Sequence, residues 1–125
     1  MLQWARMKNV IVTPTYNEKD NILLTDDPEI AVKNADLIVT DVWVSMGQEE
    51  EEEERKKIFK PLQVNNAIMN LANKDAIFMH CMPAHRDEEV TSDVLDSKFS
   101  VIWQEAENRL HAQKALLEYL LVKNN

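Results

Sequence analysis

The chain has one cysteine, Cys81, in the stretch FMHCMPAHRDEE that spans residues 78–89. A thiol beside histidines can be a nucleophile, a metal ligand or a small buried apolar group. His80 precedes Cys81 directly, and neighbouring side chains on a strand point to opposite faces, so His80 is poorly placed to activate the thiol. No second Cys/His pair at a recognised spacing accompanies His80, Cys81 and His85, so the sequence predicts no metal site.

Two further polar clusters have residue types suited to chemistry. Asp41 lies inside the apolar run VTDVWV, where an acid must be paired, hydrogen-bonded or part of a site. Ser45 follows it, and Ser45-x-x-Gln48 is also the spacing of a helix capping box, so an N-cap role for Ser45 is an equal alternative. Arg109 could belong to a site or could pair with Glu105, one helical turn earlier.

Short apolar, β-branched runs alternate with helical patterns along the chain, which favours an α/β fold with an open parallel sheet flanked by helices. Consecutive apolar residues in these runs predict strands that are buried on both faces. The expected strands are 9–14, 21–25, 36–44, 75–82 and 99–103. The expected helices are 26–35, with Asp27 as N-cap and Pro28 at its first position, then 45–62, 62–74 and 105–123.

The polar clusters follow three of the expected strands. They occupy residues 41–47, 80–86 and 105–109. Ligands of open α/β sheets bind at the carboxyl ends of the strands. We therefore expect the three clusters to converge on one crevice.

Composition limits the classes of function. The chain has 125 residues, enough for one domain, and 14 basic against 22 acidic residues give a net charge of −8. This charge argues against binding to nucleic acid or to an anionic membrane. A single cysteine forms no internal disulfide, and no apolar run approaches the roughly 18 residues of a membrane span. The expectation is a cytoplasmic protein.

Three segments in the same order carry a resemblance to a known family. They are DVWVSMGQEEE at 41–51, FMHCMPAHRDEEVTSDVLD at 78–96 and EAENRLHAQKALLEYLL at 105–121. They resemble the Ser-Met-Gly, His-Cys-Leu-Pro and Glu-Asn-Arg segments of the ornithine carbamoyltransferase family, with Met82 in place of the usual leucine. Aspartate carbamoyltransferases carry His-Pro-Leu-Pro instead, so Cys81 favours the ornithine branch. The resemblance implies a Rossmann-like, ornithine-binding C-terminal domain.

The resemblance also implies a reaction. In the family, the δ-amine of ornithine attacks the carbonyl carbon of carbamoyl phosphate, giving citrulline and phosphate, and no cofactor is involved. By resemblance, Cys81 lies beside the δ-amine and the carbamoyl group. Asp41 holds the α-amino group and orders the thiol, and Arg109 polarises the carbamoyl group.

Further binding and supporting roles follow from the same resemblance. Ser45 and the backbone of Met46 would bind the amino-acid end of ornithine as their loop closes over it. The carbonyl of Met82 would contact the carbamoyl group. Pro83 would fix the turn that directs this carbonyl into the site, and His80 would support the loop.

Some family segments have no counterpart in the sequence. These are the Ser-Thr-Arg-Thr-Arg and His-Pro-x-Gln segments of the carbamoyl-phosphate domain and the Gly-Asp-Gly-Asn-Asn turn after the first strand of the ornithine domain. We therefore expect residues 1–125 to be an ornithine-binding domain truncated at its N-terminal end, without its first strand, and inactive alone. The alternative is a non-catalytic amino-acid-binding or interaction module. An absent central strand further predicts a homo-oligomer or a separate N-terminal domain as partner.

Overall fold

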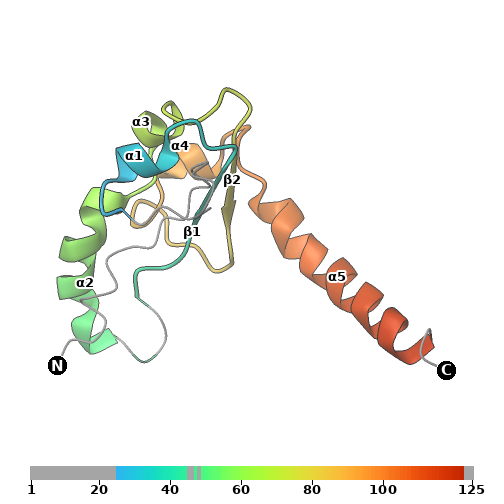
Figure 1. Cartoon of the computed structure of the whole chain (residues 1–125). Helices are drawn as coiled ribbons and strands as arrows, with labels where there is room; N and C mark the ends of the chain where they lie inside the picture. The colour runs from blue at the N-terminus through green and yellow to red at the C-terminus, as the bar shows by residue number, and fades with distance from the viewer. Residues whose placement is uncertain (1–24, 45–46, 48, 123–125) are drawn as a thin grey trace.

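The protein has an α/β fold built on a parallel strand pair (Figure 1). The computed structural model describes residues 25–44, 47 and 49–122. Strands β1 (Leu37–Thr40) and β2 (Ile77–His80) pair in register from Leu37 opposite Ile77 to Thr40 opposite His80. The predicted class, parallel strands flanked by helices, is confirmed. The strand expected at 9–14 and nearly all of that expected at 21–25 fall outside the described residues.

Four of the five α-helices of the described residues overlap the predicted ranges, and the helix at Ser92–Leu95 was not predicted. The helices are α1 (Pro28–Val32), α2 (Glu52–Phe59) with the 3₁₀ turns η2 (Glu49–Glu51) and η3 (Lys60–Leu62) at its ends, α3 (Asn66–Met69), α4 (Ser92–Leu95) and α5 (Ile102–Val122). The predicted cap of α1 is confirmed, because Asp27 Oδ1 accepts hydrogen bonds from the amides of Glu29 at 2.9 Å and Ile30 at 3.3 Å. The capping box predicted at Ser45 and Gln48 lies outside the described residues.

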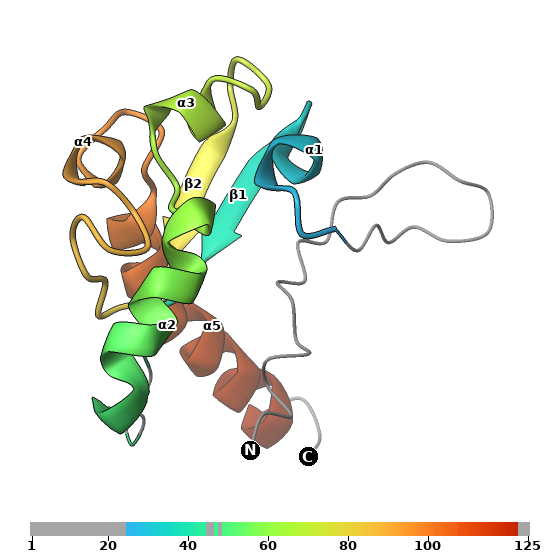
Figure 2. The same cartoon turned by 90° about the vertical axis from the view of Figure 1, so that its left-hand side faces the viewer.

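The side chains of the strand pair divide between a buried and an exposed face. Ile38 and Phe78 point into the core and are 6% and 0% exposed. On the opposite face, Leu37, Val39 and Ile77 are exposed. The expectation of strands buried on both faces is therefore wrong for the described part of the chain, because α1, α3 and α4 gather on one side of the sheet (Figures 1 and 2).

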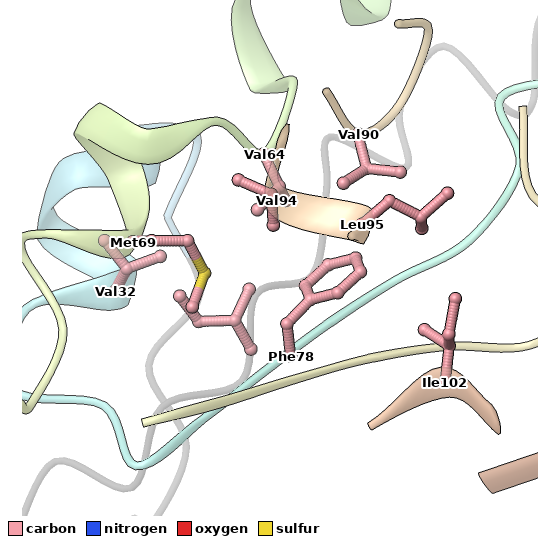
Figure 3. Close-up of a cluster of buried hydrophobic side chains, with 9 residues drawn as sticks. Val32, Val64, Met69, Phe78, Val90, Val94, Leu95 and Ile102 are labelled. Atoms are coloured by element: carbon pink, nitrogen blue, oxygen red, sulfur yellow. The ribbon is translucent and has the colours of Figure 1, made fainter. Parts of the chain in front are cut away.

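One cluster of apolar side chains holds the strands and these helices together (Figure 3). Phe78 lies among side chains from α1, α3, α4 and the start of α5. Burying such side chains is the main favourable contribution to folding, about 1.5–3 kcal/mol for each large one. The members of the cluster are Val32, Ile38, Val64, Met69, Phe78, Val90, Val94, Leu95 and Ile102.

Two expected elements are corrected. Residues 99–103 do not form a strand, since Ser100 makes only an isolated parallel bridge to Phe78 and α5 begins at Ile102. A short apolar run cannot by itself separate a buried strand from a buried helix start, and Ile102 is 1% exposed. The helix expected over 62–74 is confined to α3, because Val64 instead bridges Val90.

Helix α5 extends away from the remaining elements (Figure 1). Its first turn packs on β2, whereas Leu110 and Leu117, further along the helix, are 67% and 57% exposed. Among the described residues, no helix combines the length and apolarity needed to cross a bilayer.

Candidate functional site

The ends of the two strands bring a thiol and a carboxylate together. Asp41 directly follows β1 and Cys81 directly follows β2, and the register places their preceding residues, Thr40 and His80, opposite each other. The Cys81 thiol donates a hydrogen bond to Asp41 Oδ1 at 3.1 Å. The same oxygen accepts the Val42 amide at 2.8 Å. Cys81 is exposed, so it is accessible and is not a buried apolar group.

A second carboxylate comes from the first turn of α5. Glu105 Oε2 accepts a hydrogen bond from the His80 amide at 2.9 Å, at the last residue of β2. Asp41, Cys81 and Glu105 all line an open hollow of about 940 Å³. One residue from each of the three polar clusters therefore lies at this edge. Asp41 and Cys81 follow the carboxyl ends of the paired strands, as expected, whereas Glu105 comes from a helix.

These carboxylates keep the thiol protonated. The hydrogen bond to Asp41, partial burial and the negative charges of Asp41 and Glu105 all raise the pKa of Cys81 above its ordinary value. Cys81 is therefore a hydrogen-bond donor at neutral pH and a weak nucleophile. Two acids beside a neutral thiol suit a ligand that carries cationic amines.

His80 supports the Cys81 loop from the buried side. Its Nδ1 contacts the Cys81 carbonyl, and its Nε2 lies 3.0 Å from Glu89 Oε1. Burial opposes a charged ring, but the bonds to Glu89 and Cys81, and the charges of Glu89 and Asp41, outweigh it and raise the pKa of His80. As predicted from strand geometry, the ring does not activate the thiol.

Glu89 is the partner that fixes His80. Its side chain is 0% exposed, and Oε1 also accepts the His85 amide at 2.6 Å. Burial would raise the pKa of Glu89, but the hydrogen bonds from His80 and from the backbone of His85 lower it overall. In the described part of the chain, the buried Oε2 atom has no hydrogen-bond partner. The favoured state is a carboxylate that faces an imidazolium.

The loop that follows β2 is attached to α2, and to the turn after α2, at residues 87 and 88. Gln63 Nε2 donates to the carbonyls of Asp87 at 2.8 Å and Glu88 at 2.6 Å. Lys56 forms an ion pair with Glu88 at 2.8 Å. The loop after β2 is thus attached to α2 at one end and to β2, through His80, at the other.

For the remaining predicted site residues, the structure gives no hydrogen bond or ion pair with the side chains of Cys81 and Asp41 among the residues that it describes. Met82 is 46% exposed, and the Met82–Pro83 peptide bond is cis. Arg109 is exposed on α5, and among the described residues it has no ion pair with Glu105 and does not line the hollow. Ser45 and Met46 lie outside the described residues. The roles of these residues stay predictions.

Sequence reasoning missed Glu89 as a site residue. It placed Glu105 in the polar cluster 105–109 but gave it no role in the site, only a possible pairing with Arg109. The available signal was weak, because both acids lie in charged stretches that resemble solvated surface. A group of three possible metal ligands, His85, Glu88 and Glu89, also comes within 4.8 Å. Glu88 already pairs with Lys56 and Glu89 with His80, and Cys81 is not in this group.

Comparison with known proteins places this geometry in a family. The family model described as the Asp/Orn binding domain of aspartate/ornithine carbamoyltransferase matches residues 5–120. The chain therefore belongs to the aspartate/ornithine carbamoyltransferase family, and the match is to its amino-acid-binding domain.

Individual relatives point to the ornithine branch. Ornithine carbamoyltransferase from Hydrogenovibrio crunogenus is 66% identical over 97 residues, covering 78% of this chain and 32% of the relative. That from Pyrococcus horikoshii is 65% identical over 98 residues, with 78% and 31% covered. The solved structure of ornithine carbamoyltransferase from Pyrococcus furiosus matches with a TM-score of 0.68 at 65% identity, covering 74% of this chain and 29% of that one. The chain thus spans about a third of its relatives' length.

Proposed function

We propose that the chain supplies the amino-acid half of an ornithine carbamoyltransferase site. The observation that carries this proposal is the 3.1 Å contact between the Cys81 thiol and Asp41 at adjacent parallel strand ends, with Glu105 beside them. The substrates would be ornithine and carbamoyl phosphate. The phosphate-binding half would come from a carbamoyl-phosphate domain, and the reaction would take place in the cytoplasm, where a free thiol such as Cys81 persists.

The reaction needs an uncharged amine held against an electrophilic carbon. The δ-nitrogen of ornithine would form the new bond to the carbamoyl carbon, the bond from that carbon to the phosphate oxygen would break, and phosphate would leave with the electron pair. On the way to citrulline the δ-ammonium loses two protons, one before the attack to free the lone pair and one after the new bond has formed, and the δ-nitrogen keeps its third. Asp41 would bind the cationic α-amino group and the thiol together, so that Cys81 faces the δ-amine at a fixed distance.

The carbamoyl group would be held by groups after β2 and on α5. The Met82 carbonyl would accept a hydrogen bond from the carbamoyl amide, and the Arg109 guanidinium would stabilise the charge that develops on its oxygen. Ser45 and the backbone of Met46 would hold the amino-acid end. Pro83 would direct the Met82 carbonyl, and His80 would keep the loop in place through the Cys81 carbonyl.

Ligand protection of the thiol is a direct test on the chain as it exists. We expect L-ornithine to slow alkylation of Cys81, whereas L-norvaline, which lacks the δ-amine, protects little. In Asp41→Asn, ornithine should lose most of this protection. Equal protection by the two amino acids, or none by either, would argue against an ornithine site.

Activity is tested by complementation. The chain alone should make no measurable citrulline, because a multiply charged phosphate needs charged donors to stabilise it as a leaving group. Mixing it with the separately produced carbamoyl-phosphate domain of a relative should give citrulline. Ornithine protection without activity in any mixture would instead indicate a binding module.

A further inference from the structure

The stretch that presents Asp41 has no regular secondary structure of its own. β1 ends at Thr40, and the backbone from Asp41 to Val44 is neither strand nor helix. At its beginning, the Asp41 carboxylate is bonded to Cys81 and to the Val42 amide. Two residues on, the ring of Trp43 is buried and only 6% exposed. The position of the Asp41 carboxylate therefore depends on the contacts that hold the backbone at Trp43.

That fixing contact comes from Arg55 on α2. Arg55 Nε donates a hydrogen bond to the Trp43 carbonyl at 2.7 Å. The guanidinium lies 5.5 Å above the ring of Phe59, and the Trp43 and Phe59 rings stack at 6.4 Å. The Arg55 side chain is 11% exposed, and its Nη1 lies 3.9 Å from Glu51. A charged donor in a nearly buried site makes a stronger hydrogen bond than an exposed one.

The Arg55 contact joins both ends of a functional stretch. Residues 44–54 connect Trp43 to Arg55, and they contain the Ser-Met-Gly motif that starts at Ser45. Trp43, Arg55 and Phe59 line the same hollow as Asp41 and Cys81. We propose that Arg55 is a positioning residue of this site: by holding the Trp43 carbonyl, it keeps the Asp41 carboxylate against the Cys81 thiol. A role of the Arg55–Trp43 contact in substrate binding rests on the proposed function. The positioning of Asp41 against Cys81 does not rest on it.

The direction in which the Cys81 alkylation rate changes when Arg55 is replaced distinguishes positioning of Asp41 from a direct effect of the Arg55 charge. The charged groups that act on Cys81 are Asp41, which accepts its hydrogen bond, and Glu105, while the His80 ring is turned to the buried side. Removing a nearby cation disfavours a thiolate, so loss of the Arg55 charge alone would slow alkylation. Loss of positioning lets Asp41 move away from the thiol, which favours the thiolate and speeds alkylation. The two effects have opposite signs.

The experiment measures the rate of Cys81 alkylation by iodoacetamide as a function of pH in the full chain. Arg55→Met keeps an apolar stem over Phe59 and removes the donor, and Arg55→Lys keeps the charge but not the guanidinium fork. We expect both variants to shift the profile to lower pH, with a rate at neutral pH on the order of three- to tenfold higher. A profile that is unchanged, or shifted to higher pH, would overturn the proposal.

Two controls isolate the route through Asp41. Lys57→Met, an exposed lysine two positions along α2, should leave the profile unchanged. Leu95→Val weakens the core without touching the site and reports what lower stability alone does. In an Asp41→Asn background, Arg55→Met should no longer shift the profile to lower pH, and an equal shift to lower pH in both backgrounds would contradict positioning through Asp41. Failure of ornithine to protect the thiol would reject the proposed function but leave the pH profiles valid.

Discussion

Cys81 and Asp41 act as a pair in which the carboxylate controls the thiol. Asp41 accepts the thiol hydrogen bond and adds a negative charge beside the sulfur, and both effects raise the pKa of Cys81. The pair is therefore suited to hold an amine rather than to attack a carbonyl carbon. In this arrangement, Asp41 favours the protonated form of the Cys81 thiol.

The Asp41→Asn substitution tests this control directly. Asparagine keeps the size of the side chain but removes the charge, so the pKa of Cys81 should fall toward its ordinary value. We expect faster alkylation at neutral pH, by on the order of tenfold for each unit that the pKa falls. Glu107→Gln, on the exposed face of α5, is the matched control. An alkylation rate equal to that of the unsubstituted protein would show that Asp41 does not control the thiol.

The His80–Glu89 pair predicts a pH window of stability. The raised pKa of His80 means that its contribution is complete below its ordinary 6.5 and is lost as pH rises through the folded-state value. The lowered pKa of Glu89 means that its contribution is complete above its ordinary 4.5 and is lost as pH falls through the folded-state value. The pair therefore stabilises the fold most between pH 4.5 and 6.5.

Glu89→Gln should reveal this window in denaturant unfolding. Within it, we expect the variant to lose about 1–3 kcal/mol of unfolding free energy, because a buried ring nitrogen loses its charged partner. The difference from the unsubstituted protein should shrink on both sides of the window. A difference that is constant with pH would mean that the pair is not charged in the folded protein.

At the scale of elements, the sequence predicted helices and strands well where a single local sequence pattern specifies them. Asp27 and Pro28 specify the start of α1, and the structure has that helix start. The two described strands were placed correctly but predicted too long. Strands were expected at 36–44 and 75–82, whereas β1 ends at Thr40 and β2 ends at His80. The residues 99–103 were misassigned, because apolar residues there enter the core from the first turn of a helix.

Other features depend on contacts that no local pattern contains. Glu89 contacts His80, which is nine positions earlier in the sequence, and Arg55 contacts Trp43, which is twelve positions earlier. In the sequence, Glu89 belongs to an acidic run of three residues, 87–89, and Arg55 to a basic run, both typical of exposed surface. Their burial follows only from the way α2 and the loop after β2 pack on the strand pair.

The cap of α1 offers an element-scale test. Replacing Asp27 by alanine removes the acceptor for the amides of Glu29 and Ile30. We expect a loss of about 0.5–2 kcal/mol in unfolding free energy, since helix N-caps contribute this much. Asp27→Asn keeps a capping oxygen and should lose much less. If both variants unfold like the unsubstituted protein, α1 does not depend on its cap.

At the scale of the whole molecule, the described chain leaves two apolar surfaces uncovered. One is the outer face of the strand pair, with Leu37, Val39 and Ile77. The other runs along α5 through Leu110, Leu117 and Leu121, which are 67%, 57% and 67% exposed. These leucines are seven and four residues apart, so they share one side of the helix. Apolar surface of this kind normally contacts another protein surface.

We expect the isolated chain to associate with copies of itself through α5. Two helices with leucines at such spacing can pack along their length and remove those side chains from water. Light scattering over a dilution series should give an average mass that rises with concentration. Leu110→Glu combined with Leu117→Glu should reduce this association, because it places charges on the packed side. Asn108→Glu combined with Ala115→Glu adds the same charges at the same spacing on the opposite side, and should leave association intact. A mass that stays monomeric at every concentration, or that falls equally in both double variants, would show that the apolar side of α5 does not mediate self-association.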